Sequence, residues 1–364
     1  MPVVGATAVT INPPANTYIA MLDPLSANGT VGSGVASQLE SIRNDIRCII
    51  RRRLNVVDKT CQLGAGAIGF APESDPYVAG YDPFEALGYA KSGMVTKARP
   101  MPGPAASNWF VSVWGQGAAD REERRITFAG ANFGSATRSY TGLGGIDVVK
   151  IGIVTDADAF VIGALGSDTS SRTSIGDFTE SSTPGGGMDA SYMSGGFSVD
   201  YSFLANFTTT RGTAGGVAFA GWETNSYVSN ANMQNKFDLP SGWWVEPTVG
   251  ASFTRMTTNV GGFTDGKSLR LQGGVRAGTE WSWGTARIQP TVFALAYQDV
   301  FVDNPHLTGT AFFGPTDAGY VWGKGVGKLN VQWTDKFSTY VEGELRGRAD
   351  VIGYAGRIAS RYTF

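Results

Sequence analysis

The feature that most constrains this chain is a succession of segments, from residue 107 to the C-terminus, in which neighbouring side chains alternate in character. The last segment is the clearest, and one of its faces holds Tyr354, Gly356, Ile358, Ser360, Tyr362 and Phe364. The other face holds Arg357 and Arg361 among small side chains. A period of two is that of a β-strand, whose successive side chains point to opposite sides of the sheet. The pattern therefore predicts an antiparallel all-β structure.

Breaks rich in Gly, Asp and Asn divide this region into about twelve segments, an even number that is typical of bacterial single-chain membrane barrels. The predicted strands are 108–118, 136–150, 153–168, 188–200, 201–211, 226–237, 243–257, 267–282, 285–299, 318–333, 336–348 and 351–364. Short predicted turns alternate with longer predicted loops at 119–135, 169–187, 212–225, 258–266 and 300–317. Short turns at one rim and long loops at the other are also typical of membrane barrels.

The two faces of the predicted strands distinguish a membrane barrel from a soluble β-sandwich, which would fill one face with large aliphatic side chains. Here the polar faces carry charges of both signs, namely Glu246, Arg270, Arg276, Glu280, Lys324, Lys328, Glu342, Glu344, Arg346, Arg357 and Arg361. Aromatic residues gather near the segment ends, namely Trp109, Trp114, Trp243, Trp244, Trp281, Trp283, Trp322, Trp333, Tyr362 and Phe364. A polar lumen with aromatic girdles predicts an outer-membrane barrel. The charges either pair around a helix inside the lumen or solvate a water-filled one.

The N-terminal region predicts two helices. Between residues 33 and 53, apolar side chains recur every three or four residues, with arginines on other faces. A second helix is predicted at residues 82–97, because it begins with residues that favour helix initiation, namely Asp82, Pro83 and Glu85. We expect an irregular segment with an amphipathic helix at 1–81, a linker helix and Pro-rich spacer at 82–106, and the barrel at 107–364. We expect helix 82–97 in the lumen and helix 33–53 outside the membrane.

Motifs of chemical interest have simpler structural explanations. Only one histidine, His306, is present, and we interpret it as a loop residue. Gly185–Gly187 lacks the lysine and helix of a phosphate loop and is expected to form a loop tip. We expect 121–125 to be a solvated loop, Asp156 and Asp158 to form a tight turn, and Cys48 and Cys61 either to pair or to remain thiols. The sequence predicts no catalytic, metal-binding or cofactor-binding residue, so an enzyme is not expected.

Three motifs resemble one known family. Residues 243–253 (WWVEPTVGASF) are similar to a W-x-x-E-P-x-x-G-x-x-[YF] strand, and residues 109–117 (WFVSVWGQG) to a first strand, of the bacterial autotransporter translocator domain. The C-terminal strand ends in Phe364, as in the signal for barrel assembly, which would comprise Tyr354, Ile358, Tyr362 and Phe364. The resemblance covers residues 82–364. It implies a 12-stranded barrel with a helix threaded through its pore and an N-terminal passenger.

This resemblance implies a function in type V secretion, in which the barrel sits in the outer membrane and helps to export its own passenger. The implied partners are outer-membrane lipid, lipopolysaccharide and the barrel-assembly machinery, with a monomeric barrel and no cofactor. A net charge of −2 gives no general attraction to nucleic acid. Residues 1–30 lack a secretory signal, so we expect the translocator end of a longer precursor or a passenger-poor relative. The alternatives are a porin-like channel, a surface-anchored adhesin and a soluble β-sandwich.

Overall fold

The computed structural model describes residues 108–128, 131–155, 158–175, 177–214, 217–259, 262–305, 308 and 319–364. It also describes a helical segment made of residues 40, 42–43, 45–47 and 49–51, which we call the inner helix. The predicted helix at 82–97, Cys48, Cys61, Asp156 and His306 lie outside the described residues.

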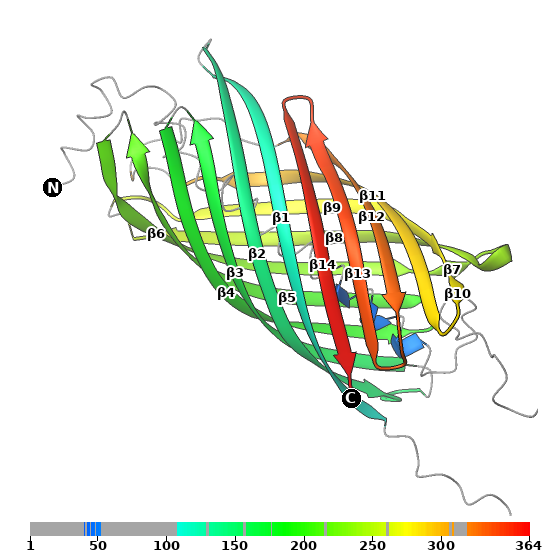
Figure 1. The fold of residues 1–364 in the computed structure, drawn as a ribbon. Coiled ribbons are helices and arrows are strands. Elements are labelled where there is room, and N and C mark those ends of the chain that lie inside the picture. The colour runs from blue at the N-terminus through cyan, green and yellow to red at the C-terminus, as the bar shows by residue number, and fades with distance from the viewer. Residues whose placement is uncertain are drawn as a thin grey trace, which may run out of the picture.

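The strands run in chain order around the molecule (Figure 1). They are β1 (Trp109–Phe128), β2 (Ala131–Ile151), β3 (Asp158–Ile175), β4 (Asp177–Ser194), β5 (Phe197–Ala214), β6 (Val217–Asn235), β7 (Phe237–Asp238), β8 (Trp243–Thr258), β9 (Gly266–Thr279), β10 (Trp281–Trp283), β11 (Ala286–Asp303), β12 (Val321–Gln332), β13 (Phe337–Arg348) and β14 (Val351–Thr363). A short 3-10 turn, η1 (Pro240–Gly242), precedes β8.

The described strands close into a barrel. They form one sheet of 14 strands, in which the two shortest, β7 and β10, only extend turns beside β8 and β11. The remaining twelve form a ring because β9 joins β8 to β11, and β14 pairs with β1. This seam runs antiparallel from the pair Ser112–Thr363 to the pair Arg124–Val351. Every described strand therefore has a hydrogen-bonded neighbour on both sides or lies in a turn, which removes exposed sheet edges.

The alternation in the sequence becomes an inside and an outside. On β14, Ile358 is 62% exposed and faces outward, whereas Arg361 is 3% exposed and faces the lumen. On β13, Leu345 faces outward at 57% exposure, between the buried Glu344 and Arg346. Apolar residues outside and charged residues inside reverse the order of a soluble protein, as a barrel surrounded by lipid requires.

One rim of the barrel carries an aromatic girdle. It holds the start of β1, the end of β14 and the turns that join β2 to β3, β4 to β5 and β12 to β13, and we call it the terminal rim. Its exposed aromatic side chains are Trp109, Phe197, Phe237, Trp243, Trp281, Trp283, Trp333, Phe337, Tyr362 and Phe364. Trp114, Trp244 and Trp322 were expected in a girdle, but they are buried and face the lumen. Each of these three tryptophans lies an odd number of residues from the outward-facing residues of its own strand, so its side chain points inward.

The predicted loops at 119–135, 169–187 and 212–225 are wrong, because the described residues of these ranges form the far halves of β1 to β6. Pairing continues to Phe128–Ala131, Ile175–Asp177 and Ala214–Val217. These strands have 18 to 21 residues, whereas about 10 residues cross a membrane. Beyond the apolar band both faces of a strand become polar, so the alternation fades although the ladder continues. Facing hydroxyls such as Thr183 and Thr208, 3.0 Å apart, help to hold these halves together.

Two further predictions in this region are corrected. Gly185–Gly187 lies within β4, not in a loop tip, and an added Cβ at Gly187 would lie 2.2 Å from the backbone oxygen of Phe203. Glycine is therefore required there by the close approach of β5. Residues 121–125 lie in β1, and Glu122 is buried at 4% exposure. The turn between β4 and β5 falls at Gly195, with φ of 55°, so the predicted strand 188–200 crosses a real turn.

Within the described residues, no helix has the length and apolar character of a membrane-spanning helix.

Candidate functional site: the occupied lumen

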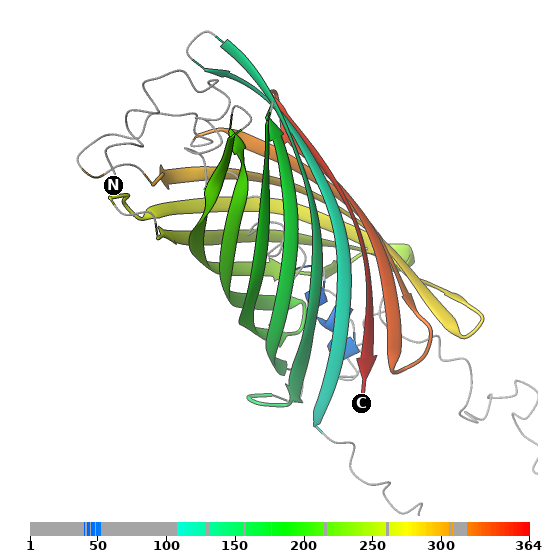
Figure 2. The same cartoon turned by 60° about the vertical axis from the view of Figure 1, so that its left-hand side comes forward.

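The inner helix lies inside the barrel (Figures 1 and 2). Its apolar side chains are fully buried against the wall: Ile42 shares a cluster with Trp114, Leu143, Leu165, Leu204, Val228, Tyr340 and Ala359. Ile46, Ile49 and Ile50 share a second cluster with Phe110, Val149, Ala159, Val161 and Met193. The expectation that residues 33–53 lie outside the membrane is therefore wrong for the described part of this helix. An amphipathic pattern does not reveal whether its apolar face meets a soluble partner or the inner wall of a barrel.

The helix has a defined direction. Ile49 and Ile50 belong to the cluster of Phe110 and Met193, which lie next to the terminal rim. Ile42 belongs to the cluster of Trp114, which lies four residues further along β1. Arg51 donates to the backbone oxygen of Gly196, in the turn between β4 and β5, at 3.1 Å. The C-terminal end of the helix therefore points to the terminal rim, and its N-terminal end points to the opposite rim.

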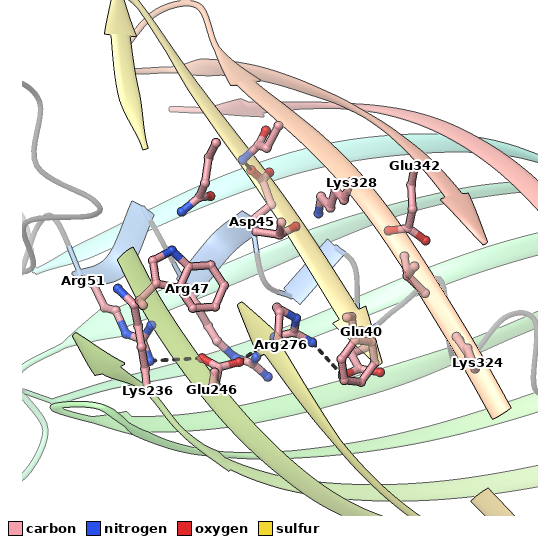
Figure 3. Close-up of a pocket in the computed structure, with 16 residues that line it drawn as sticks. Glu40, Asp45, Arg47, Arg51, Lys236, Glu246, Arg276, Lys324, Lys328 and Glu342 are labelled. Carbon is pink, nitrogen blue, oxygen red and sulfur yellow. Dashed lines mark hydrogen bonds and ion pairs between the residues drawn. The ribbon is translucent and has the colours of Figure 1, made fainter. Parts of the chain in front are cut away.

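Three arginines of the helix meet three acidic residues of the wall. Arg43 pairs with Asp189 of β4 at 3.4 Å, and Arg47 pairs with Asp200 of β5. Arg51 reaches Glu246 of β8 at 3.7 Å (Figure 3). All six side chains are nearly inaccessible to solvent. A buried charge without its partner is strongly destabilising, so these pairs favour one position of the helix.

Two acidic residues of the helix meet basic residues of the wall. Asp45 accepts from Arg361 at 3.0 Å and from Asn330 at 2.9 Å. Ser338 donates to the same carboxylate at 3.1 Å. Glu40 pairs with Arg276 of β9 at 2.8 Å. The helix is thus held by charge from five strands and the apolar clusters.

Arg361 links the helix to the seam of the barrel. Besides Asp45, its guanidinium donates to Asp147 of β2 at 2.5 Å and to Ser112 of β1 at 2.7 Å. It also donates to the backbone oxygen of Ile42 at 3.1 Å. Because Arg361 belongs to β14, these bonds cross the β14–β1 seam from the inside. Closure of the barrel and docking of the helix therefore share one side chain.

A second cluster crosses the same seam further from the terminal rim. Arg346 of β13 pairs with Asp120 at 2.5 Å and with Glu122 at 3.1 Å, both on β1. Within the C-terminal strands, Arg346 also contacts Glu344 at 3.1 Å, and Arg357 bonds to Glu342 and to Glu344. Lys324 of β12 completes the cluster at 3.1 Å from Glu344.

The remaining charges that the sequence singled out also lie inside. Arg270 makes two bonds to Asp299, at 2.8 and 3.0 Å, and stacks over Tyr297. Arg276 bonds to Glu246 at 2.5 Å, in addition to its contact with the helix. Arg287 lies 3.5 Å from Glu280, and Lys328 lies over the ring of Tyr340.

Sequence reasoning missed the acidic partners of these bases. They are Asp120, Glu122, Asp147, Asp189, Asp200 and Asp299. Asp147, Asp200 and Asp299 each adjoin outward-facing apolar residues, and Asp120 and Glu122 lie in a charged stretch of β1. The available signal was the parity of their positions relative to buried residues of the same strand, such as Trp114 on β1 and Leu143 on β2, because inward positions recur every second residue.

The four residues of the C-terminal signal lie together on the outer face of β14. Tyr354, Ile358, Tyr362 and Phe364 are all exposed. The rings of Tyr362 and Phe364 meet edge to face, with centroids 5.1 Å apart. The backbone N–H of Phe364 donates to the carbonyl of Val111 at 2.9 Å, which ties the chain end to β1.

A small cavity of about 60 Å³ lies beside the helix, on the side of β9, β11 and β12 (Figure 3). Its lining includes Arg276, Lys324 and Lys328. Among the described residues, no group of three or more His, Cys, Asp or Glu side chains is placed to hold a metal ion.

Comparison with known proteins agrees with this architecture. The family model of the autotransporter β-domain matches residues 113–344. A search of curated proteins found no match. Similar solved structures include the β-domain of the Bordetella autotransporter BrkA, with 17% identity and a TM-score of 0.55, covering 69% of this chain and 99% of that one. The translocator domain of NalP from Neisseria meningitidis has 14% identity and a TM-score of 0.52, covering 70% and 88% of the two chains.

The transport unit of AIDA-I from Escherichia coli is a third similar structure, with 13% identity and a TM-score of 0.51, covering 70% of this chain and 90% of that one. At these identities the likeness shows the fold alone, and it confirms the predicted 12-stranded barrel with an N-terminal helix. The family match covers more than half of the chain and confirms the resemblance seen in the sequence. The chain therefore belongs to the autotransporter β-domain family, the outer-membrane barrels of type V secretion that anchor an N-terminal passenger and help to translocate it.

Proposed function

We propose that the inner helix is the retained end of the exported chain, so that residues before 40 are delivered to the cell surface while residues 40–51 stay in the lumen. The observation that carries this proposal is the match between helix and wall. The apolar side of the helix meets two apolar clusters, and each of five charged side chains meets an opposite charge. A segment passing through without stopping would not need such a match.

The direction of the helix supports the same proposal. Its C-terminal end points to the terminal rim, where β1 begins. Outer-membrane barrels have short turns at the periplasmic side and longer extensions at the extracellular side, and here β1 to β6 extend far beyond a membrane-crossing length at the rim opposite the terminal rim. The N-terminal end of the helix therefore points to the cell surface, as export of the preceding residues requires.

A protease assay on intact cells tests this orientation. The full chain is expressed behind a cleavable secretion signal, with an epitope tag inserted at Gly5. We expect added protease to remove the tag, because residues before the inner helix lie at the cell surface. A matched tag at Asp335, in the exposed turn between β12 and β13, should be protected until the outer membrane is permeabilised. Protection of the Gly5 tag, or cleavage of the Asp335 tag in intact cells, would contradict the proposal.

We also propose which molecules contact the outer face of the barrel. We assign lipid and lipopolysaccharide to the apolar outer face, on a monomeric barrel spanning residues 107–364. We assign the barrel-assembly machinery to the strand that carries Tyr354, Ile358, Tyr362 and Phe364. No covalent chemistry is needed for any of these roles, so we propose that the chain is not an enzyme.

The assembly signal has its own test. Phe364→Asp places a charge on the lipid-facing end of β14 and should strongly reduce the heat-modifiable, membrane-inserted protein in cells. Phe364→Tyr keeps the ring and should insert normally. Equal insertion of the Asp variant and the unaltered chain would mean that the terminal aromatic residue is not recognised.

A further inference from the structure

Arginines stand directly opposite one another on the outer face of β1, β2 and β3. In the register of these strands Arg121 pairs with Arg138, and Arg138 pairs with Arg172. Each lies an even number of residues from exposed apolar side chains of its own strand, such as Ile146 and Ile162, so all three point away from the lumen. Like charges directly opposite each other destabilise a sheet. The folding of the barrel therefore does not explain these three residues, which we call the arginine row.

Acidic side chains compensate the arginine row only at its ends. Glu123, on the same face of β1, lies 2.6 Å from Arg121, and Glu180 of β4 lies 3.9 Å from Arg172. The central arginine of the row faces another arginine on each neighbouring strand. Beyond Glu180 the register adds a fourth arginine, Arg211 of β5. Four arginines and two carboxylates at this level give the outer face a net positive charge.

Other outward charges of these strands lie further away and offset each other. Asp168 lies four residues from Arg172, on the side of the terminal rim, and Arg125 lies four residues from Arg121, on the other side. At the rise of a strand each separation is about 13 Å. The positive charge of the row therefore remains local.

The arginine row lies at the outer boundary of the lipid-facing band. Trp109, in the girdle of the terminal rim, and Arg121 are twelve residues apart on β1. With a strand tilt of about 40° this separation spans about 30 Å along the barrel axis, whereas the apolar band of such barrels is about 25 Å tall. Exposed tyrosines adjoin the row, because Tyr140 lies two residues from Arg138 and Tyr354 lies opposite Arg121. Tyrosine is enriched where hydrocarbon meets the polar headgroups, so the row lies at headgroup level.

The chemistry of this level of the membrane identifies a ligand. In the orientation proposed above, on which this inference rests, the row lies in the outer leaflet, where lipopolysaccharide carries phosphate groups between its acyl chains and its sugars. A guanidinium can donate two parallel hydrogen bonds to a phosphate and stays charged at every physiological pH. Side chains on directly opposite strand positions begin about 5 Å apart, so one phosphate can contact two arginines of the row. It would also relieve the repulsion between them.

We propose that the arginine row binds the phosphate groups of lipopolysaccharide, with Arg211 extending the site onto β5. The acyl chains of the same molecule lie against the apolar face next to the row, where Ile146 and Ile162 are exposed. The proposal gives a defined site to a partner that was assigned above only to the outer face as a whole.

Titration of the purified, folded full chain with short-chain lipopolysaccharide tests the site. Native mass spectrometry from a non-ionic detergent counts the bound molecules and gives their affinity. The double variant Arg138→Gln, Arg172→Gln should weaken binding about tenfold or more, because it removes charge-assisted hydrogen bonds to phosphate. The same change relieves repulsion between like charges, so the barrel should still reach its heat-modifiable, folded form.

Two controls separate a phosphate site from general attraction. Lys150→Gln with Lys336→Gln removes two positive charges near the terminal rim and should leave the affinity nearly unchanged. Lipopolysaccharide from which the phosphates have been removed should bind the unaltered chain as weakly as the phosphorylated form binds the double arginine variant. Equal binding of the two forms, or an unchanged affinity of the double arginine variant, would overturn the proposal. Displacement of lipopolysaccharide by millimolar inorganic phosphate would assign the row to a soluble anion and would also overturn it.

Photocross-linking in intact cells separates this proposal from the proposed export function. Tyr140 replaced by p-benzoylphenylalanine should capture lipopolysaccharide, whereas the same replacement of Phe337, at the terminal rim, should not. Capture only at Phe337 would mean that the barrel is inserted in the opposite orientation, and it would overturn both proposals. Capture at neither position, in cells where protease removes the tag at Gly5, would overturn the lipopolysaccharide site alone.

Discussion

Arg361 is the side chain on which most of the lumen converges. It joins β14 to Asp147 of β2 and to Ser112 of β1, and it holds Asp45 of the inner helix. Arg361 therefore does more than pair with nearby carboxylates. It makes the energy of the barrel seam depend on whether the helix is in place.

Replacing Arg361 by Ala should therefore be costly. The change leaves two buried carboxylates, Asp45 and Asp147, without their shared partner, and we expect a loss of about 3–5 kcal/mol in the free energy of unfolding. Denaturant unfolding of the barrel in lipid measures this loss. The control is Arg172→Ala: Arg172 lies 3.9 Å from Glu180 with its side chain 62% exposed, and it should cost less than about 1 kcal/mol. Similar losses for both variants would show that the lumen pair at Arg361 carries no special weight.

Gly187 lies where the close approach of β5 leaves no room for a side chain on β4. An added Cβ would lie 2.2 Å from the oxygen of Phe203 and 2.8 Å from the side chain of Leu204. Gly187→Ala should therefore force β4 away from β5 and cost about 1–3 kcal/mol in unfolding experiments. At Gly166, on β3, an added Cβ meets nothing within 4 Å, so Gly166→Ala should be nearly neutral. Equal stability of the two variants would mean that the β4–β5 approach is looser than described.

Each strand has a lipid-facing side that favours apolar residues and a lumen-facing side that favours polar and charged residues. Leu345 faces lipid, whereas Lys328, on the neighbouring strand, faces the lumen. Leu345→Arg should cost about 2–4 kcal/mol if it lies near the middle of the membrane, because a charge must then enter the hydrocarbon. Lys328→Arg keeps a cation in the lumen and should be tolerated. Folding titrations in lipid vesicles compare the two variants, and equal costs would mean that the faces are reversed.

The strands also set the limit of what sequence could predict. Alternation located β13 and β14 to within one or two residues, because their outer residues meet lipid and their inner residues carry charge. It failed in the far halves of β1 to β6, where serine and threonine stand on both faces and hydrogen-bonded pairs such as Thr137 and Thr173 replace the apolar signal. The prediction of an aromatic girdle was wrong for three tryptophans for a related reason. Trp114 packs against the inner helix and not against lipid, and composition alone does not separate these two apolar surroundings.

For the whole molecule, the barrel was predictable and the identity of its occupant was not. The sequence presents two candidate helices: residues 33–53 have the length of a lumen, whereas residues 82–97 are shorter but adjoin the first strand. What decides between them is the match of charges across distant parts of the chain, such as Arg43 with Asp189 and Asp45 with Arg361. These pairs join residues that lie 146 and 316 positions apart, and no local pattern reveals them.

The proposed export function requires that the inner helix is docked in the lumen of the membrane-inserted protein. Cross-linking in cells measures this, with Arg47→Cys and Asp200→Cys introduced together in a background that has Cys48→Ser and Cys61→Ser. The double change removes both members of a buried ion pair, so no charge is left unpaired. A short bifunctional maleimide should cross-link these thiols in the membrane-inserted fraction. The rival pair, Lys91→Cys with Gln272→Cys, should give no product. Cross-linking of the rival pair alone would contradict the account and would place residues 82–97 in the lumen instead.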